Sequence, residues 1–214
     1  MEEISVRQAT KKDIPFLAKI ILMAETSGHE LVSYKKMFPI SDSELLSGFE
    51  ATLDNEQFGH GLTYETFLIA ELDGKAGAAA CGYIEGEHGS SNHLMTGALM
   101  TGFPTELIIA GYKKNAEFKE IQINKTPGTL QIDSVATLPE FRGKGLFKLI
   151  FEEHCKAAEA EGCNQVEIQV WSGNQGAIST YKKLGCEITF EKYIDINNLK
   201  LGGKVLMTRK IKDS

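Results

Sequence analysis

The sequence is short of the features that mark several large classes of protein. None of its four cysteines forms a CxxC pair, so the pattern of a zinc site or a disulfide framework is missing, and we expect free thiols in a reducing compartment. No apolar run approaches the ~20 residues that span a bilayer. The first residues, Met1-Glu2-Glu3, lack the basic and apolar regions of a signal peptide. These absences predict a cytoplasmic protein without membrane contact or a bound metal.

Positive charge is scarce as well. The 214 residues include 29 acidic and 23 basic ones, which gives a formal net charge of −6. Proteins that bind nucleic acids regardless of sequence use a broadly basic face, so we expect no nucleic-acid partner. An anionic ligand would have to be held by a local pocket. Hydrophobic residues make up 42% of the chain, which is enough to form a core and excludes a disordered or fibrous protein.

Hydrophobic periodicity predicts strands and helices that alternate along most of the chain. The capping pair Ser41 and Glu44 and the hairpin turn Asp73-Gly74 mark two of the junctions. We predict strands near 4–8, 66–72, 75–84, 129–137, 165–170, 186–190 and 204–210, and helices near 11–24, 41–49, 144–162 and 177–184. Residues 85–127 fit no such pattern, and we expect an irregular insertion there with one or two helical turns. Because no linker or internal repeat is visible, residues 1–214 are expected to form a single mixed α/β domain.

The strand predicted at 129–137 contains a change of phase. Leu130 and Ile132 share one face, whereas Val135, the next large apolar residue, falls on the other. A β-bulge or a splayed strand end produces such a change. We therefore expect an irregularity of this kind close to Val135.

A glycine-rich segment, LPEFRGKGLF at residues 138–147, joins that strand to the next helix. Such a turn points successive backbone N–H groups at one spot, at the positive end of the helix dipole, where a phosphate can bind. Arg142, Lys144 and Lys148 add positive charge nearby. A flexible turn with solvated lysines is the alternative interpretation. A Walker loop is excluded because Leu146 follows the last glycine, and a Rossmann fingerprint is excluded because Lys148 stands where its third glycine would be.

This segment resembles a motif of the GNAT superfamily, the acyl-CoA-dependent N-acyltransferases. Arg142-x-x-Gly145-x-Phe147 is similar to the superfamily's Q/R-x-x-G-x-G/A pattern, and Phe147 departs from it by replacing Gly or Ala. Only the backbone amide of Phe147 would be needed at a phosphate, so its side chain is expected to turn into the helix packing.

A second segment, residues 174–186, is similar to the superfamily's N-x-x-A-x-x-x-Y-x-x-x-G-F pattern. Asn174 and Tyr181 match it, and Cys186 replaces the aromatic residue. Taken alone, Asn174 could be a helix N-cap and Tyr181 could be a core residue. The order of strand, glycine turn, helix, strand and Asn-Tyr helix adds to the resemblance.

The resemblance implies a mostly antiparallel central sheet flanked by helices, in which a splayed pair of strands holds coenzyme A. It implies transfer of an acetyl group from acetyl-CoA to a primary amine of a small molecule or a protein, by direct attack on the thioester. The Tyr181 hydroxyl would protonate the leaving thiolate, and backbone amides of the splayed strand would bind the carbonyl oxygen. The residues expected to bind CoA are Val135, Ala136, Thr137, Arg142, Gly143, Lys144, Gly145, Leu146, Phe147, Lys148 and Asn174. Dimers are frequent in the superfamily, so the resemblance also allows a homodimer.

The base that deprotonates the incoming ammonium group has several candidates. Asp133 shares strand parity with Val135 and could accept the proton directly or through water, although a carboxylate that only fixes a neighbouring loop would look the same. Glu30, Glu85 and Glu87 are further candidates, and the sequence does not rank them.

Two other functions stay open at this point. A CoA-binding regulatory module would keep the fold without turnover, and it would show no acyl transfer that a Tyr181→Phe change could reduce. A nucleotide-binding enzyme could use the Gly143-Lys144-Gly145 turn for phosphate, and ATP or a dinucleotide would then stabilise the protein more than CoA does.

Overall fold

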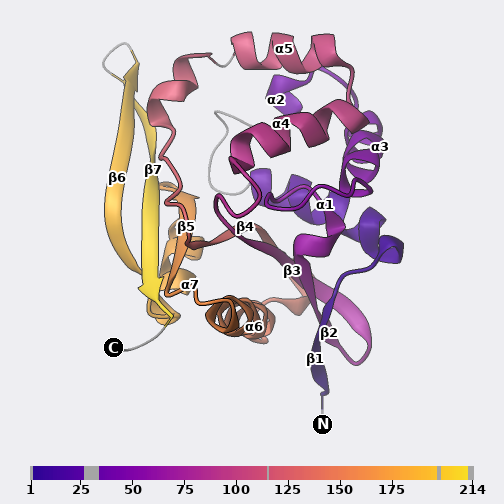
Figure 1. The fold of residues 1–214 in the computed structure, drawn as a ribbon, viewed down its shortest axis with the longest axis vertical. Coiled ribbons are helices and arrows are strands. Elements are labelled where there is room, and N and C mark those ends of the chain that lie inside the picture. The colour runs from indigo at the N-terminus through magenta and orange to yellow at the C-terminus, as the bar shows by residue number, and fades with distance from the viewer. Residues whose placement is uncertain (1, 27–33, 115, 197–198, 212–214) are drawn as a thin grey trace.

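The computed structural model describes residues 2–26, 34–114, 116–196 and 199–211. Within these residues the chain forms a seven-stranded sheet with the order β1-β2-β3-β4-β5-β7-β6 (Figure 1). Neighbouring strands are antiparallel, except that β4 and β5 are parallel. The strands are β1 (Ile4–Gln8), β2 (Phe67–Leu72), β3 (Lys75–Ile84), β4 (Leu130–Thr137), β5 (Gln165–Trp171), β6 (Glu187–Ile196) and β7 (Leu199–Lys210). This mixed, mostly antiparallel sheet confirms the predicted fold class.

Helices cover both faces of the sheet (Figure 1). One face carries α6 (Leu146–Ala160) and α7 (Gln175–Lys183). The other carries α1 (Ile14–Glu25), α2 (Tyr34–Met37), α3 (Asp42–Leu53), α4 (Ser91–Gly102) and α5 (Thr105–Lys114). Short 3₁₀ turns are η1 (Lys11–Asp13), η2 (Tyr64–Thr66), η3 (Ala116–Ile121) and η4 (Pro139–Phe141).

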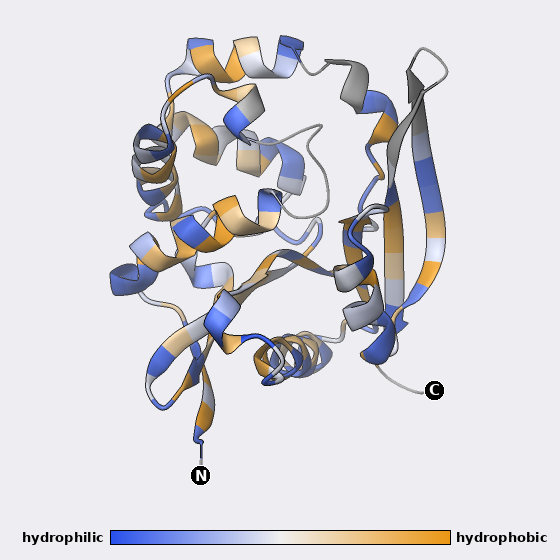
Figure 2. Cartoon of the chain, turned by 180° about the vertical axis from the view of Figure 1, so that it is seen from behind, coloured by the Kyte–Doolittle hydropathy of each residue, from blue (hydrophilic) through white to orange (hydrophobic). Residues whose placement is uncertain are grey.

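Each face of the sheet has its own hydrophobic core. Ile150 and Phe151 of α6 are fully buried in the first core, while Leu17 of α1 and Phe49 of α3 are fully buried in the second. Figure 2 shows hydrophobic and hydrophilic residues alternating around α6, as an amphipathic helix on a sheet requires. The two cores hold the strands and helices that surround the site described below.

Local signals in the sequence fix several element boundaries. The Ser41 and Glu44 side chains form the predicted capping box at the start of α3. Both residues of the predicted hairpin turn, Asp73 and Gly74, have positive φ between the antiparallel strands β2 and β3. Helix α6 ends at Ala160, close to the predicted end at 162, and Gly162 follows with a positive φ while Cys163 N–H donates to Ala158 carbonyl. These predictions are confirmed.

Residues 85–127 correct the prediction of one or two helical turns. They contain two full helices, α4 with 12 residues and α5 with 10 residues, followed by η3. The sequence of α4, SNHLMTGALMTG, carries Gly and Thr, which are weak helix formers, and few large apolar residues. α4 and α5 form because they pack on α3 and α2, respectively. The weak periodicity of α4 therefore hides it in the sequence. α5 does have helical spacing, with Ile108 and Gly111 buried on one face, and the prediction missed it.

Strand β4 contains the predicted irregularity. Cys81 pairs with Asp133 and Ala79 pairs with Ala136, so two residues of β4 stand opposite one residue of β3. The first of these two, Ser134, has a φ of 50°. The bulge lets Val135 pack in the same core as Leu130 and Ile132 despite their different parity.

The parallel strands β4 and β5 separate soon after they begin. Only Leu130 and Gln131 of β4 pair with β5, although β4 continues to Thr137. The region beyond Gln131, where the two strands diverge, is called the sheet opening below. A bulge and a splayed end are therefore both present in β4, and the glycine-rich turn follows directly.

Candidate active site

The edge of β4 at the sheet opening carries unpaired backbone groups. The Leu138 N–H donates to the Gly77 carbonyl at 2.8 Å, and this hydrogen bond continues the ladder between β4 and β3. Because successive residues of an antiparallel strand point their backbone groups to opposite edges, Thr137 directs its N–H and C=O away from β3. The Thr137 carbonyl accepts a hydrogen bond from Arg142 Nε at 3.3 Å. The remaining groups of this edge are available to an extended ligand.

The glycine turn, residues 138–145, lies between this edge and α6. Gly143 and Gly145 have φ of 77° and 78°, and a Cβ atom at either position would meet nothing within 4 Å. Gly145 is the N-cap of α6 and offers no capping side chain. The first N–H groups of α6 therefore have no partner within the helix and face open space. This arrangement fits a diphosphate, because the amides, the positive helix end and the room for an anion coincide.

Two of the three basic residues near the turn already bind other groups of the protein. Arg142 is held by its bond to Thr137, and Lys144 forms an ion pair with Glu2. Lys148 is exposed on α6. The backbone amides and the helix end are therefore the main attraction for an anion here, and Lys148 is a further exposed positive charge nearby.

Phe147 does not fill the turn. Its side chain is 8% exposed and packs between Phe151, at 6.0 Å between ring centroids, and Tyr181, at 5.7 Å. Leu146 is likewise buried in the core. Both side chains turn into the helix packing, as expected, and leave their amides at the start of α6.

Helix α7 brings the second predicted motif against the first. Asn174 caps the helix, and its Oδ1 accepts from Ala177 N–H at 3.1 Å. Tyr181 packs edge-on against Phe147 of α6 and is 6% exposed. Both structural interpretations of these residues are therefore realised. The packing against Phe147 also places Tyr181 next to the first turn of α6.

The Tyr181 hydroxyl is buried and protonated. It forms no hydrogen bond to any residue that the structure describes. Burial, and to a lesser degree the negative charge of Asp133, raises the pKa of Tyr181 above its usual value. The hydroxyl therefore stays protonated at neutral pH.

Asp133 is tied to two side chains that sequence analysis missed. Its Oδ2 accepts from Lys125 Nζ at 2.8 Å and from Tyr83 hydroxyl at 2.9 Å, and Lys125 also donates to the Tyr83 hydroxyl. Burial opposes ionisation of Asp133, but the charge of Lys125 and these hydrogen bonds outweigh it and lower its pKa. Asp133 is thus a weaker base than the sequence-based hypothesis requires, and it fixes the segment that carries Lys125.

Three further ionisable residues lie near Asp133 without having been singled out in the sequence. Glu25 ends α1, Tyr34 begins α2, and Lys204 lies on β7 with its Nζ 5.5 Å from the centre of the Trp171 ring. Burial raises the pKa of Glu25 to about 7 and lowers the pKa of Lys204. No local motif marks these residues, because only the packing of α1, α2 and β7 brings them together.

The other carboxylates considered as the base do not lie at the sheet opening in the described chain. Glu85 is 8% exposed and its Oε1 accepts from Ser91 N–H at 3.3 Å. Glu87 lines a hollow between β3 and the C-terminal part of α6. Glu30 lies outside the described residues.

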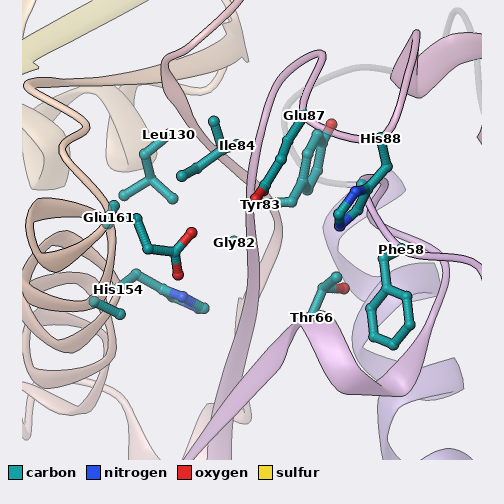
Figure 3. A pocket seen from close by; sticks show the side chains of 13 residues that line it. Phe58, Thr66, Gly82, Tyr83, Ile84, Glu87, His88, Leu130, His154 and Glu161 are labelled. Carbon is teal, nitrogen blue, oxygen red and sulfur yellow. The ribbon is translucent and has the colours of Figure 1, made fainter.

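That hollow is separate from the sheet opening. Figure 3 shows His154 of α6 and Glu161, which follows the end of α6, on one side of it and Phe58 and His88 on the other. His154 is buried against Gly82, its Nε2 lies 3.1 Å from the Ala80 carbonyl, and burial lowers its pKa to about 4. His154 therefore has a structural role, and none of the residues predicted to bind CoA lines this hollow.

Two features are absent from the part of the chain that the structure describes. No group of three or more His, Cys, Asp or Glu side chains in that part of the chain is arranged to hold a metal ion. No helix there is both long and apolar enough to cross a membrane.

A family model and several solved structures match this chain. The model of the acetyltransferase (GNAT) family matches residues 32–186. The fold is similar to an N-acetyltransferase from Staphylococcus aureus Mu50, with 16% identity, 96% of this chain and 100% of that chain covered, and a TM-score of 0.68. It is also similar to an acetyltransferase, with 18% identity, 97% of this chain and 100% of that chain covered, and a TM-score of 0.62. The ribosomal-protein-S18-alanine N-acetyltransferase from Escherichia coli matches with 14% identity, 99% of this chain and 96% of that chain covered, and a TM-score of 0.52.

Proposed function

Because the chain belongs to the acetyltransferase (GNAT) family and so transfers an acetyl group from acetyl-CoA, we propose that its acceptor is a primary amine of a small molecule or a protein. Two structural neighbours are N-acetyltransferases, which supports a nitrogen acceptor. We also propose that residues 1–214 act as one domain, since β1 and β7 belong to the same sheet. A cytoplasmic location and a homodimer stay predictions.

The observation that carries this proposal is the coincidence of three features at the sheet opening. The free edge of β4, the open glycine turn and the Tyr181 hydroxyl lie on consecutive or packed elements. An extended chain that ends in a diphosphate would lie along the β4 edge and reach the start of α6. Acetyl-CoA has this shape, and the residues present therefore fit it.

For CoA binding, we propose that amides of residues 143–148 hold the diphosphate. Val135, Ala136 and Thr137 would bind the extended arm through the backbone of β4, and Asn174 would contact it from the start of α7. Arg142, Lys144 and Lys148 would supply positive charge at the rim. The support is the positive φ and open space at Gly143 and Gly145 together with the unpaired first turn of α6.

When bound, acetyl-CoA supplies an acyl carbon that an amine can attack and a thiol that can leave. A backbone N–H on the β4 edge would hold the carbonyl oxygen as negative charge develops there. The Tyr181 hydroxyl would give its proton to the leaving sulfur. The hydroxyl carries this proton at neutral pH.

The test measures binding and turnover separately. Titration calorimetry with CoA, ATP and a dinucleotide should show binding of CoA alone. A panel of primary amines and a matched panel of alcohols, each with acetyl-CoA, should show thiol release only with amines, and mass spectrometry should identify the N-acetyl product. CoA binding without thiol release would favour a regulatory module, and O-acetylation of alcohols would refute the amine acceptor.

A further inference from the structure

Glu25 lies on the face of the sheet opposite α6, where α1 packs against β3 and β4. On that face β4 presents Asp133 and β7 presents Lys204, and the charges of both act on Glu25. In the sheet β5 lies between β4 and β7. Glu25 therefore lies on the part of this face where β5 runs between Asp133 and Lys204.

The position along β5 follows from the strand pairing. Asp133 comes two residues after Gln131, the last residue of β4 that pairs with β5. Lys204 stands opposite Trp171, the last residue of β5. Both charges thus mark the end of β5 from which β4 diverges. Glu25 consequently lies above the sheet opening, beside the strand edge proposed for acetyl-CoA.

The Glu25 carboxylate is available for proton transfer. Its side chain is half-buried, and it forms no hydrogen bond or ion pair with any part of the chain that the structure describes. The ionisable groups that face it are Tyr34 on α2, Asp133 on β4 and Lys204 on β7. Burial raises the pKa of Glu25 to about 7, although the charge of Lys204 works against this shift. A carboxylate with this pKa accepts and releases protons readily at neutral pH.

The competing carboxylates are less suitable. Asp133 is bonded to Lys125, which lowers its pKa. Glu85 is buried with one oxygen bonded to the amide of Ser91, and Glu87 lines the separate hollow beside α6. Of these four described carboxylates, Glu25 alone combines a carboxylate without a hydrogen bond in the described chain with a position at the sheet opening.

We propose that Glu25 is the general base that removes a proton from the ammonium group of the acceptor. This inference rests on the proposed function, because it requires an amine acceptor. Glu25 takes one proton from R–NH₃⁺, and the amine nitrogen then bonds to the acetyl carbonyl carbon. The C–S bond breaks, the sulfur receives the Tyr181 proton, and Tyr181 recovers a proton from the nitrogen. Glu25 returns its proton to solvent, so ammonium and thioester yield amide, thiol and one proton.

The kinetic test compares wild type with Glu25→Gln over a range of pH. In wild type, kcat/KM for a primary amine should show an inflection near the pKa of Glu25, about 7. Glu25→Gln should lack this inflection and lose about 100-fold in kcat/KM at neutral pH, with the KM for acetyl-CoA unchanged. A weakly basic amine that is already neutral needs no base, so with it the variant should approach the wild-type rate.

Two further variants serve as controls. Glu50→Gln removes another half-buried helical carboxylate, on α3, and should keep the wild-type pH profile. Glu25→Asp keeps a carboxylate and should retain the inflection at a reduced rate. Equal melting temperatures would show that the variants are folded.

A spectroscopic measurement tests the same point without any ligand. In protein labelled with ¹³C at the glutamate carboxyl carbons, the signal that disappears in Glu25→Gln should titrate near neutral pH. Titration near the ordinary value of about 4.3 would overturn the inference. So would an unchanged pH profile of Glu25→Gln in a protein that acetylates amines, and the proposed function would then stand. If wild type acetylates no amine, both proposals fail.

Discussion

Replacement of Gly145 by alanine tests whether the glycine turn binds CoA. Gly145 has a φ of 78° and a ψ of 8°, in the left-handed region that disfavours residues with a Cβ atom. The added Cβ would meet no protein atom within 4 Å and would instead project into the open space at the start of α6. The substitution therefore perturbs the backbone conformation and the proposed phosphate site, but not the packing of the core.

The two effects have different expected sizes. An L-residue in the left-handed region costs about 1–2 kcal/mol, which is partly offset because alanine reduces the freedom of the unfolded chain. A net loss of about 1 kcal/mol corresponds to a decrease in Tm of about 2–4 °C for a chain of this size. A displaced phosphate would lose much of one charge-assisted hydrogen bond, worth about 1.5–3 kcal/mol, so CoA affinity should fall roughly 10- to 100-fold.

Gly162 provides a matched control at the other end of the same helix. Its φ is 86°, and a Cβ there also meets nothing within 4 Å. Gly162→Ala should therefore lower the Tm by a similar amount but leave CoA affinity unchanged. Thermal melting without ligand and calorimetric titration with CoA measure the two quantities. Unchanged CoA affinity in Gly145→Ala, or an equal loss in Gly162→Ala, would refute the assignment of the phosphate site.

Three other substitutions have defined outcomes. Tyr181→Phe should lower kcat about 100-fold with little change in Tm, because the hydroxyl has no partner in the described chain; a steady-state rate within threefold of wild type would contradict its role as the acid. The Asp13 carboxylate accepts a hydrogen bond from Arg7 at 2.8 Å, and this bond is the main reason that the pKa of Asp13 falls to about 2. The ion pair therefore stabilises the folded protein fully above the unfolded pKa of about 3.9, and this stabilisation is lost as the pH falls towards 2. Asp13→Asn should therefore cost about 1 kcal/mol at neutral pH, a modest figure because Arg7 is partly exposed, and urea unfolding should show the difference shrinking in acid. Gly82→Ala would place a Cβ 2.4 Å from the buried ring of His154 and should cost about 1–3 kcal/mol, whereas its additional cost in a His154→Ala background should be smaller.

Much of the site could be predicted from the sequence because its signals are local. The phase change between Ile132 and Val135 predicted a bulge or splayed end of β4, and both are present. The glycine pair at 143 and 145 predicted an open turn at a helix start, and the structure has one. Each of these features depends on a few neighbouring residues, and the conformational preferences of those residues are enough to predict the local backbone conformation.

Other parts of the site could not be found in this way. Helix α4 lacks strong periodicity and forms against α3. The pairing of Lys125 with Asp133 requires the segment after η3 to return to β4, and no spacing rule predicts that return. The sequence-based choice of Asp133 as base overlooked Lys125 for this reason.

The sequence by itself determined the fold class, the family, the irregularity of β4 and the open glycine turn, because periodicity, caps and glycines act over short stretches of chain. Only the tertiary structure decided the protonation properties of the acidic groups. Glu25 and Asp133 are both carboxylates, yet burial without a partner raises the pKa of the first, and the contact with Lys125 lowers that of the second. Such shifts depend on which distant segments surround a side chain, and that is fixed only when α1, β4 and β7 pack together.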